Sequence, residues 1–133
     1  RTRKQFGSAL SQFQSLQHRA VDMFINIEEV RSLVMHAAAK AWSESEYERV
    51  RAVSAAKALT NRAGRLVAQE AIQLHGGMGM TLELPLADFV RRLLAIELMF
   101  GGERFQRRRF ADAADEGSEK TVFVSPKKQW KQI

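Results

Sequence analysis

The stretch Gln73-Leu74-His75-Gly76-Gly77-Met78-Gly79-Met80 ends a long run of helical periodicity and places three glycines within four residues. Glycine adopts a positive φ without strain and lets a ligand approach the main chain closely. Because helices very often end at glycine, one interpretation of the segment is a stop between two helices. A glutamine on the last helical turn, followed by bare backbone, is also suited to hold a polar cofactor. The glycines alone leave both interpretations open.

The composition fits a single domain of 133 residues that contains no cysteine, which excludes disulfides and a thiolate nucleophile. No apolar run approaches the ~20 residues of a membrane span, and no signal-peptide pattern opens the chain. The chain starts at Arg1 inside sequence of helical character, so we expect further sequence upstream. A formal charge of +6 favours an anionic partner, which is a nucleic acid, a phosphorylated cofactor or an acidic surface.

Apolar residues that recur at three- and four-residue steps predict an all-α fold, an up-and-down helical bundle. Ser43 with Glu46, or Ser45 with Glu48, forms a capping-box pattern that opens the second helix, and Pro85 suits the opening of the third. We place the domain at residues 1–114 and expect an irregular tail over 115–133. The expected helices cover about 8–42, 43–73, 86–99 and, as a short fourth, 103–114.

Few side chains carry an isolated chemical signal. His18, His36 and His75 have no metal-ligand spacing, so we predict no metal site. The basic runs Arg107-Arg108-Arg109 and Lys127-Lys128 lack the interleaved aromatic residues of single-strand binders and any duplex-reading motif. A nucleic-acid-binding module therefore rests on charge alone, and we do not predict it.

A second informative segment lies near the start. Arg3-Lys4-Gln5-Phe6-Gly7 is followed by Phe13-Gln14 and Ala20-Val21-Asp22-Met23, and arginine can bind a phosphate through two parallel hydrogen bonds. With Gln73-x-x-Gly76-Gly77-x-Gly79, Glu83-x-Pro85 and Arg91-Arg92 in the same order, these motifs resemble the C-terminal helical-bundle domain of the acyl-CoA dehydrogenases, which are FAD flavoproteins. The resemblance runs from Arg3 to about Ala111 and implies that the first helix of the bundle lies upstream of this chain.

The resemblance also implies how the motifs are used. Arg3 would bind the FAD pyrophosphate, Gln14 would lie near the adenosine, and the glycine segment would hold the adenine end. Such residues usually contact FAD that a neighbouring subunit binds, which implies a homo- or hetero-oligomer, a dimer or tetramer. The family further implies an acyl-CoA substrate, an electron-transfer acceptor and a cytoplasmic, bacterial protein of fatty acid metabolism. The implied cofactor-binding residues are Arg3, Gln5, Gln14, Gln73, His75, Gly76 and Gly77.

The chain departs from the family pattern where many members carry a catalytic Glu. The corresponding segment reads Met99-Phe100-Gly101-Gly102-Glu103. Counting from Gln73 places Phe100, or with a shift of one residue Gly101, at the Glu position. Glu97 and Glu103 lie within one helical turn of it but are not in register with it. The catalytic residue is therefore unknown, and the variant resembles the small-subunit type of bacterial dehydrogenases. Two functions stay open: an acyl-CoA dehydrogenase domain that forms 2,3-enoyl-CoA with its base upstream, or a non-catalytic partner subunit that completes a FAD site. We expect the fragment to be inactive in isolation and not to bind FAD alone.

Overall fold

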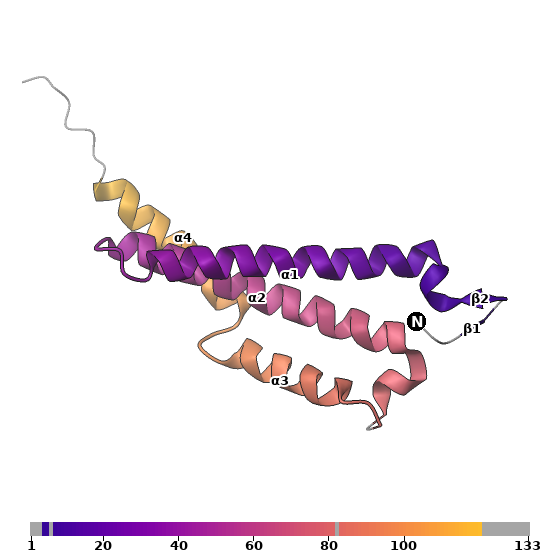
Figure 1. The fold of residues 1–133 in the computed structure, drawn as a ribbon. Helices are drawn as coiled ribbons and strands as arrows, with labels where there is room; N and C mark the ends of the chain where they lie inside the picture. Colours follow the sequence, from indigo (N-terminus) through magenta and orange to yellow (C-terminus); the bar gives the residue numbers. More distant parts are fainter. Residues whose placement is uncertain (1–3, 6, 82, 121–133) are drawn as a thin grey trace, which may run out of the picture.

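The computed structural model describes residues 4–5, 7–81 and 83–120, with side chains up to Ala113. Four α-helices dominate this part of the chain (Figure 1). A two-stranded hairpin and two short 3-10 helices accompany them. In chain order the elements are β1 (Lys4–Gln5), β2 (Ser8–Ala9), η1 (Leu10–Gln12), α1 (Gln14–Lys40), α2 (Glu46–His75), η2 (Gly76–Met80), α3 (Leu86–Leu98) and α4 (Glu103–Lys120).

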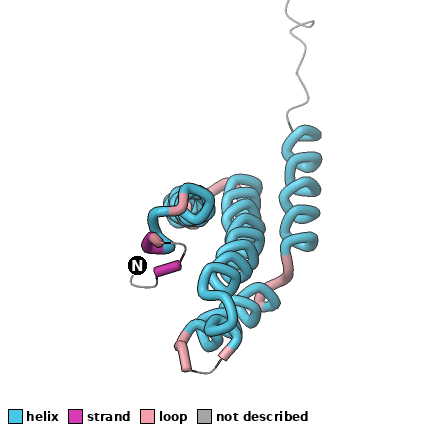
Figure 2. Tube along the Cα trace, turned by 90° about the vertical axis from the view of Figure 1, so that its right-hand side faces the viewer, coloured by secondary structure: helices cyan, strands magenta, loops and turns pink. Residues whose placement is uncertain are grey.

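The central helix of the fold is α2, which packs against each of the other three α-helices. α1 runs antiparallel to α2 after a short turn, and Figure 2 shows α1 and α4 on opposite sides of α2. The prediction of an all-α, up-and-down bundle is confirmed, with α2 as its axis. Two-residue strands pair antiparallel at the amino-terminal end, Lys4 opposite Ala9 and Gln5 opposite Ser8.

Small residues let the neighbouring helices approach α2 closely. Every fully buried apolar residue of the described chain is an alanine, and a Cβ placed on Gly64 of α2 would make only an ordinary contact of 3.7 Å with Leu93 Cδ2 of α3. Large apolar side chains are instead left on the outside, such as Phe24 of α1, which is 62% exposed. The buried alanines are Ala52, Ala56, Ala63, Ala68 and Ala113.

The observed boundaries differ from the predicted ones by one to three residues in α2 and α3, and by more at the start of α1 and the end of α4. α1 begins at Gln14 rather than Ser8, because residues 8–12 form β2 and η1 and Phe13 is extended. α1 also ends at Lys40, two residues before Trp42. α4 continues to Lys120, so helix extends over 115–120, a stretch that we expected to be irregular, whereas the tail from 121 onward lies outside the described residues.

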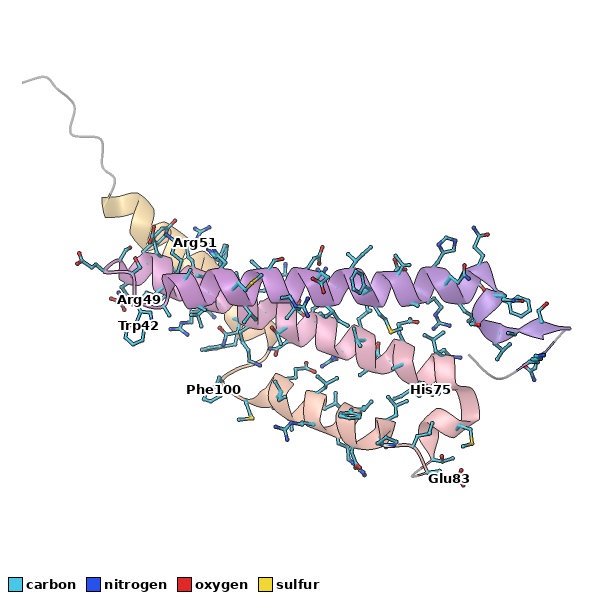
Figure 3. The ribbon with its side chains drawn as sticks, viewed as in Figure 1. Trp42, Arg49, Arg51, His75, Glu83 and Phe100 are labelled. Atoms are coloured by element: carbon cyan, nitrogen blue, oxygen red, sulfur yellow. The ribbon has the colours of Figure 1, made fainter. Side chains whose placement is uncertain are left out.

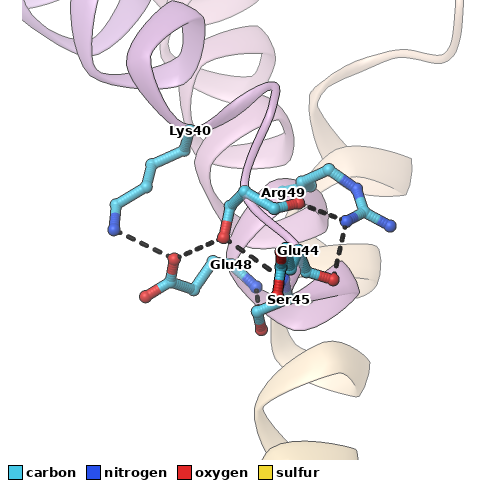
Figure 4. Close-up of polar contacts among 6 residues, drawn as sticks. Lys40, Glu44, Ser45, Glu48 and Arg49 are labelled. Atoms are coloured by element: carbon cyan, nitrogen blue, oxygen red, sulfur yellow. Dashed lines mark hydrogen bonds and ion pairs between the residues drawn. The ribbon is translucent and has the colours of Figure 1, made fainter.

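The turn between α1 and α2 is held by side chains (Figure 4). Ser45 is the N-cap of α2, and its Oγ accepts a hydrogen bond of 3.3 Å from the backbone N–H of Glu48. The Glu48 carboxylate accepts from Lys40 Nζ at 3.0 Å and from Ser43 Oγ at 2.8 Å. These two hydrogen bonds, with Lys40 first, lower the pKa of Glu48 below its ordinary value. The second of the two capping-box patterns therefore starts α2, and its glutamate links α2 back to α1.

Candidate functional site

The two motif-bearing segments lie at the same end of the α1–α2 pair (Figure 1). Because the helices are antiparallel, the start of α1 lies beside the last turns of α2, where Figure 1 also shows β1 and β2. An ion pair ties the two helices together near this end, with 2.5 Å between Arg19 Nε and Glu70 Oε2. We call this region, formed by residues 4–5, 7–14 and 73–80, the hairpin end.

The predicted cofactor residues fall at the hairpin end as far as they are described. Gln5 is exposed on β1, and Gln14 is the exposed first residue of α1. Gln73 and His75 are exposed on the last turn of α2, and Gly76 and Gly77 open η2. Arg3 lies outside the described residues.

The glycine segment is a helix stop with an exposed backbone. Gly76 has a φ of 60°, and its N–H bonds back to the carbonyl of Gln73. A Cβ placed on Gly76 or Gly77 would meet nothing within 4 Å, so the main chain there faces open space. Gly79 differs, because it is buried and a Cβ there would lie 2.6 Å from the carbonyl oxygen of Ile72. Close packing therefore explains why residue 79 is a glycine. At residue 76 the glycine is explained by its positive φ, and its backbone is exposed.

The polar groups of the hairpin end fit the adenosine half of FAD chemically. The side-chain amides of Gln14 and Gln73 are exposed and make no hydrogen bond within the described chain. His75 Nδ1 lies 2.7 Å from the carbonyl oxygen of Ala71, which leaves Nε2 for another partner. Amides and a ring nitrogen can donate to and accept from ribose hydroxyls and adenine nitrogens. Several donors and acceptors without a partner in the described chain thus lie at the same end of the α1–α2 pair as an open stretch of backbone.

The second region of interest is the turn between α3 and α4, residues 99–102, which we call the 99–102 turn. It lies away from His75 along α3, as Figure 3 shows with the labelled Phe100. Phe100 and Gly101 have successive positive φ angles of 59° and 94°, and the Phe100 side chain is 83% exposed. A positive φ is uncommon for a bulky residue, so the surrounding structure must hold it.

Two buried side-chain amides hold the 99–102 turn from inside the bundle, and Lys57 hydrogen-bonds to one of them. The Gln106 amide donates to the carbonyl of Phe100 at 2.6 Å, and the Asn61 amide donates to that of Gly101 at 3.3 Å. Lys57 Nζ donates to Asn61 Oδ1 at 2.5 Å and to the carbonyl of Ile96 at 2.7 Å. Burial lowers the pKa of Lys57, against the pull of Glu97. Asn61 and Gln106 are each 3% exposed, so the turn is anchored in the core.

Sequence reasoning did not single out these anchoring residues. The available signal was a polar residue on the alanine stripe of α2, since Asn61 lies between the buried Ala56 and Ala63. Spacing alone could not connect Asn61 to Gly101, which is 40 residues away.

The carboxylates nearest the 99–102 turn are engaged in ion pairs. Glu97 binds the Arg65 guanidinium through two contacts, one of them 3.3 Å between Nε and Oε2. Glu103 Oε1 lies 3.6 Å from Arg107 Nη1. At Gly101 itself, a Cβ would run into the ring of Phe105. The described part of the turn therefore offers no unpaired carboxylate.

The described residues show neither of two other kinds of feature. No group of three His, Asp or Glu side chains among them could hold a metal ion. None of their helices is both long enough and apolar enough to cross a membrane.

Comparisons with known proteins show which class of domain this antiparallel helical bundle belongs to. The family described as "Acyl-CoA dehydrogenase, C-terminal domain" matches residues 1–114. The chain belongs to this acyl-CoA dehydrogenase family.

Individual relatives are longer than this chain. A 3-sulfinopropanoyl-CoA desulfinase of Paraburkholderia xenovorans is 39% identical over 67% of this chain and 22% of its own length. The solved structure titled "Tcur3481-Tcur3483 steroid ACAD G363A variant" has a TM-score of 0.82 at 29% identity, over 89% of this chain and 32% of that one. "PigA with FAD and proline" has a TM-score of 0.76 at 26% identity, over 85% of this chain and 29% of that one. The chain thus spans between a fifth and a third of the proteins it matches.

Proposed function

We propose that this chain is the C-terminal helical domain of an FAD-dependent acyl-CoA dehydrogenase that converts an acyl-CoA to the 2,3-enoyl-CoA, passes electrons to a transfer acceptor and works in the bacterial cytoplasm. The observation that carries the proposal is the hairpin end, where the exposed Gln73 and His75 directly precede the exposed backbone of Gly76 and Gly77, and where Gln14 lies at the same end of the bundle. The family match and the solved relative with FAD in its title add support.

The proposed role of the hairpin end is to anchor and orient the cofactor. Gln73, Gly76 and Gly77 would contact the adenine end, Gln14 the adenosine, and Arg3 the pyrophosphate, with Gln5 and His75 beside them. Bound FAD supplies the acceptor for the hydride that leaves the β-carbon of the acyl group. Holding it in one orientation contributes to rate because the reacting bonds must be aligned.

The α-proton of the acyl-CoA needs a base that the 99–102 turn lacks. A general base must lie within hydrogen-bond reach of the proton that it removes, and the nearby Glu97 and Glu103 are committed to Arg65 and Arg107. We place the base in the protein upstream of this chain or in a partner subunit.

A second candidate function is a non-catalytic subunit that completes a FAD site in a hetero-oligomer. The positive φ and crowding at Gly101 favour it, because this backbone disfavours the catalytic side chain of other family members. In this version the protein supplies cofactor contacts, and its partner supplies the base.

Visible absorption of the intact protein tests the first function. Flavin bands that co-purify with the protein, and acyl-CoA-dependent reduction of an electron acceptor by the protein alone, are expected of a homo-oligomeric dehydrogenase. Turnover that requires a second subunit supports the non-catalytic role instead. If no flavin is retained with or without candidate partners, both functions fail.

A matched pair of variants tests the hairpin end itself. Gln73→Ala removes an exposed amide at this end, and we expect it to weaken FAD retention by about tenfold, the size of one lost polar contact. Asn26→Ala removes an amide from the middle of α1, where Asn26 bonds only to the carbonyl of Asp22. Equal FAD retention in the two variants would contradict the assignment.

A further inference from the structure

The turn between α1 and α2, at the opposite end of this helix pair from the hairpin end, carries an exposed tryptophan. Trp42 is 92% exposed, which makes it the most exposed of the large apolar side chains described. Figure 3 shows it at the far end of the molecule from His75. Tryptophan is highly buried on average, and at interfaces it is among the side chains that contribute most to binding. Trp42 is therefore suited to anchor a segment that docks on this turn.

Two carboxylates of the α1–α2 turn have no partner. Glu44 and Glu46 are exposed, and neither side chain makes a hydrogen bond or an ion pair in the described part of the chain. The cations beside them are engaged, since Lys40 is paired with Glu48 at 3.0 Å and Arg49 donates to two backbone carbonyls of the turn. A segment with an aromatic ring and basic side chains would therefore match both the tryptophan and the free carboxylates.

The carboxyl end of α4 brings the rest of the chain to this surface. The Cζ of Arg51, near the start of α2, lies 4.2 Å from the centre of the Phe110 ring, so α4 runs beside the first turns of α2. From Phe110, α4 continues to Lys120, about 15 Å further at ~1.5 Å per residue. Figure 1 shows the end of α4 at the same end of the molecule as the α1–α2 turn. Residues 121–133 follow, and a segment of this length spans up to ~43 Å, which is well beyond the length of α4 from Phe110 to Lys120.

The chemistry of residues 121–133, which lie outside the described residues, matches this surface. The segment contains three lysines, no acidic residue and one of the two tryptophans of the chain, in the sequence Thr121-Val122-Phe123-Val124-Ser125-Pro126-Lys127-Lys128-Gln129-Trp130-Lys131-Gln132-Ile133. We propose that this segment docks on the α1–α2 turn of its own chain. In the docked state Trp130 packs against Trp42, and Lys127 and Lys128 pair with the two free carboxylates.

The two kinds of contact contribute differently to docking. An aromatic pair stabilises beyond the area that it buries, whereas exposed ion pairs contribute little to stability. The two tryptophans therefore supply the anchor, and the lysines set the position of the segment on the turn. This inference does not rest on FAD binding, because the surface lies at the other end of the α1–α2 pair from the hairpin end.

Fluorescence quenching of Trp42 in the full chain tests the proposal. Trp130→Phe leaves Trp42 as the single tryptophan and keeps an aromatic ring in the docking segment. We expect acrylamide to quench Trp42 about twofold less in this variant than in a chain shortened to end at Lys120, because covering one face of the indole removes about half of its accessible surface. Circular dichroism checks that both chains are folded. Equal quenching in the two chains would overturn the proposal.

Charge reversals in the same background test the pairing of the lysines. Lys127→Glu/Lys128→Glu should raise the quenching toward that of the shortened chain, because like charges then face each other. Adding Glu44→Lys/Glu46→Lys should lower it again, because opposite charges then face each other once more. If the added substitutions leave the quenching as high as before, the proposed contact is wrong.

Two controls separate docking within one chain from other causes. Arg62→Glu/Arg92→Glu makes the same change of charge at exposed arginines of α2 and α3 that have no partner in the described chain, and should leave the quenching unchanged. A rise equal to that of the lysine variant would assign the effect to net charge and contradict docking. Dilution of the protein by about a hundredfold should also leave the quenching unchanged, since the contact is within one chain. Quenching that rises on dilution would mean that another copy covers Trp42, and the proposal would fail.

Discussion

Phe100 is the one residue other than glycine with a positive φ in the described part of the chain, and Gly101 follows it with another. Both have positive φ angles, and the side chains of Gln106 and Asn61 hold their carbonyl oxygens. A residue other than glycine pays about 1–3 kcal/mol for such a conformation. Phe100 bears that cost and points its ring into solvent, whereas Gly101 has Phe105 against its missing Cβ. A side chain at position 101 is thus disfavoured both by the backbone conformation and by the Phe105 ring.

Gly101→Ala should destabilise the chain by about 1–3 kcal/mol, because alanine resists the positive φ and its Cβ meets the Phe105 ring. Gly64→Ala is the control, for which we expect a change of opposite sign in the free energy of unfolding. Gly64 lies inside α2 with only an ordinary contact to Leu93, so alanine should stabilise by about 0.5–1 kcal/mol. Urea unfolding followed by circular dichroism measures both. A neutral Gly101→Ala would show that the turn has no strain.

Asn61→Ala should cost about 1–3 kcal/mol, because it leaves the Gly101 carbonyl and a charged Lys57 Nζ each short of a partner near the core. Asn26→Ala removes an amide whose only bond is local, to Asp22 on the same helix, and should stay within about 0.5 kcal/mol of the wild type. The same urea assay compares the two variants. Similar effects at both positions would deny Asn61 its anchoring role.

Among the helices, local signals predicted most of the starts and stops. Ser45 marked the start of α2, Pro85 that of α3, and Gly76 the end of α2, and each acts on its own backbone neighbours. The predicted start of α1 was wrong because helical periodicity continues through residues 8–12, whereas residues 8–9 pair as β2 and residues 10–12 form η1. At the hairpin end, the glycine pattern and the resemblance to a known family predicted the glycine segment as part of the candidate site. The anchors of the 99–102 turn depend on contacts between α2, α3 and α4, which no local pattern encodes.

The α1–α2 turn should lose a stabilising contribution in acid through Glu48. Its pKa is lowered by the hydrogen bonds from Lys40 and Ser43, so the unfolded chain takes up this proton first as the pH falls. The contribution is therefore complete above the ordinary pKa of 4.5 and is lost as the pH drops through the lower, folded value. Glu48→Gln should destabilise the chain at pH 7 and match the wild type more closely near pH 3.

Glu44→Gln is the matched control for this pH dependence. Glu44 lies in the same turn and takes part only through its backbone carbonyl, which accepts from Arg49 at 3.0 Å. Urea midpoints of the wild type and both variants at pH 7 and pH 3 measure the effect. If the gap between wild type and Glu48→Gln stays constant across this range, the Lys40–Glu48–Ser43 contacts do not couple stability to pH.

Many large apolar side chains of the bundle are exposed on its surface rather than buried in a core. Only alanines are fully buried among the apolar residues described, while Phe24, Ile25 and Val34 of α1 are each about half exposed or more. Phe24 and Ile25 also line a mainly apolar groove of about 540 Å³ against Leu59 of α2. Exposed apolar area of this extent marks an interaction surface. It is consistent with a domain that packs on other parts of a larger protein.

The isolated chain should therefore self-associate through α1. We expect a thermal midpoint that rises with protein concentration, because association stabilises the folded state by mass action. Phe24→Glu/Val34→Glu places two charges on the exposed apolar face and should abolish that dependence, whereas Ser15→Glu/His18→Glu adds negative residues at exposed polar positions of α1 and should keep it. Light scattering after gel filtration, combined with melts over a hundredfold range of concentration, separates these cases. If the chain is a monomer and its thermal midpoint does not change with protein concentration, the prediction is wrong. The helices of this chain would then be stable without association, although only alanines are fully buried among the described apolar residues.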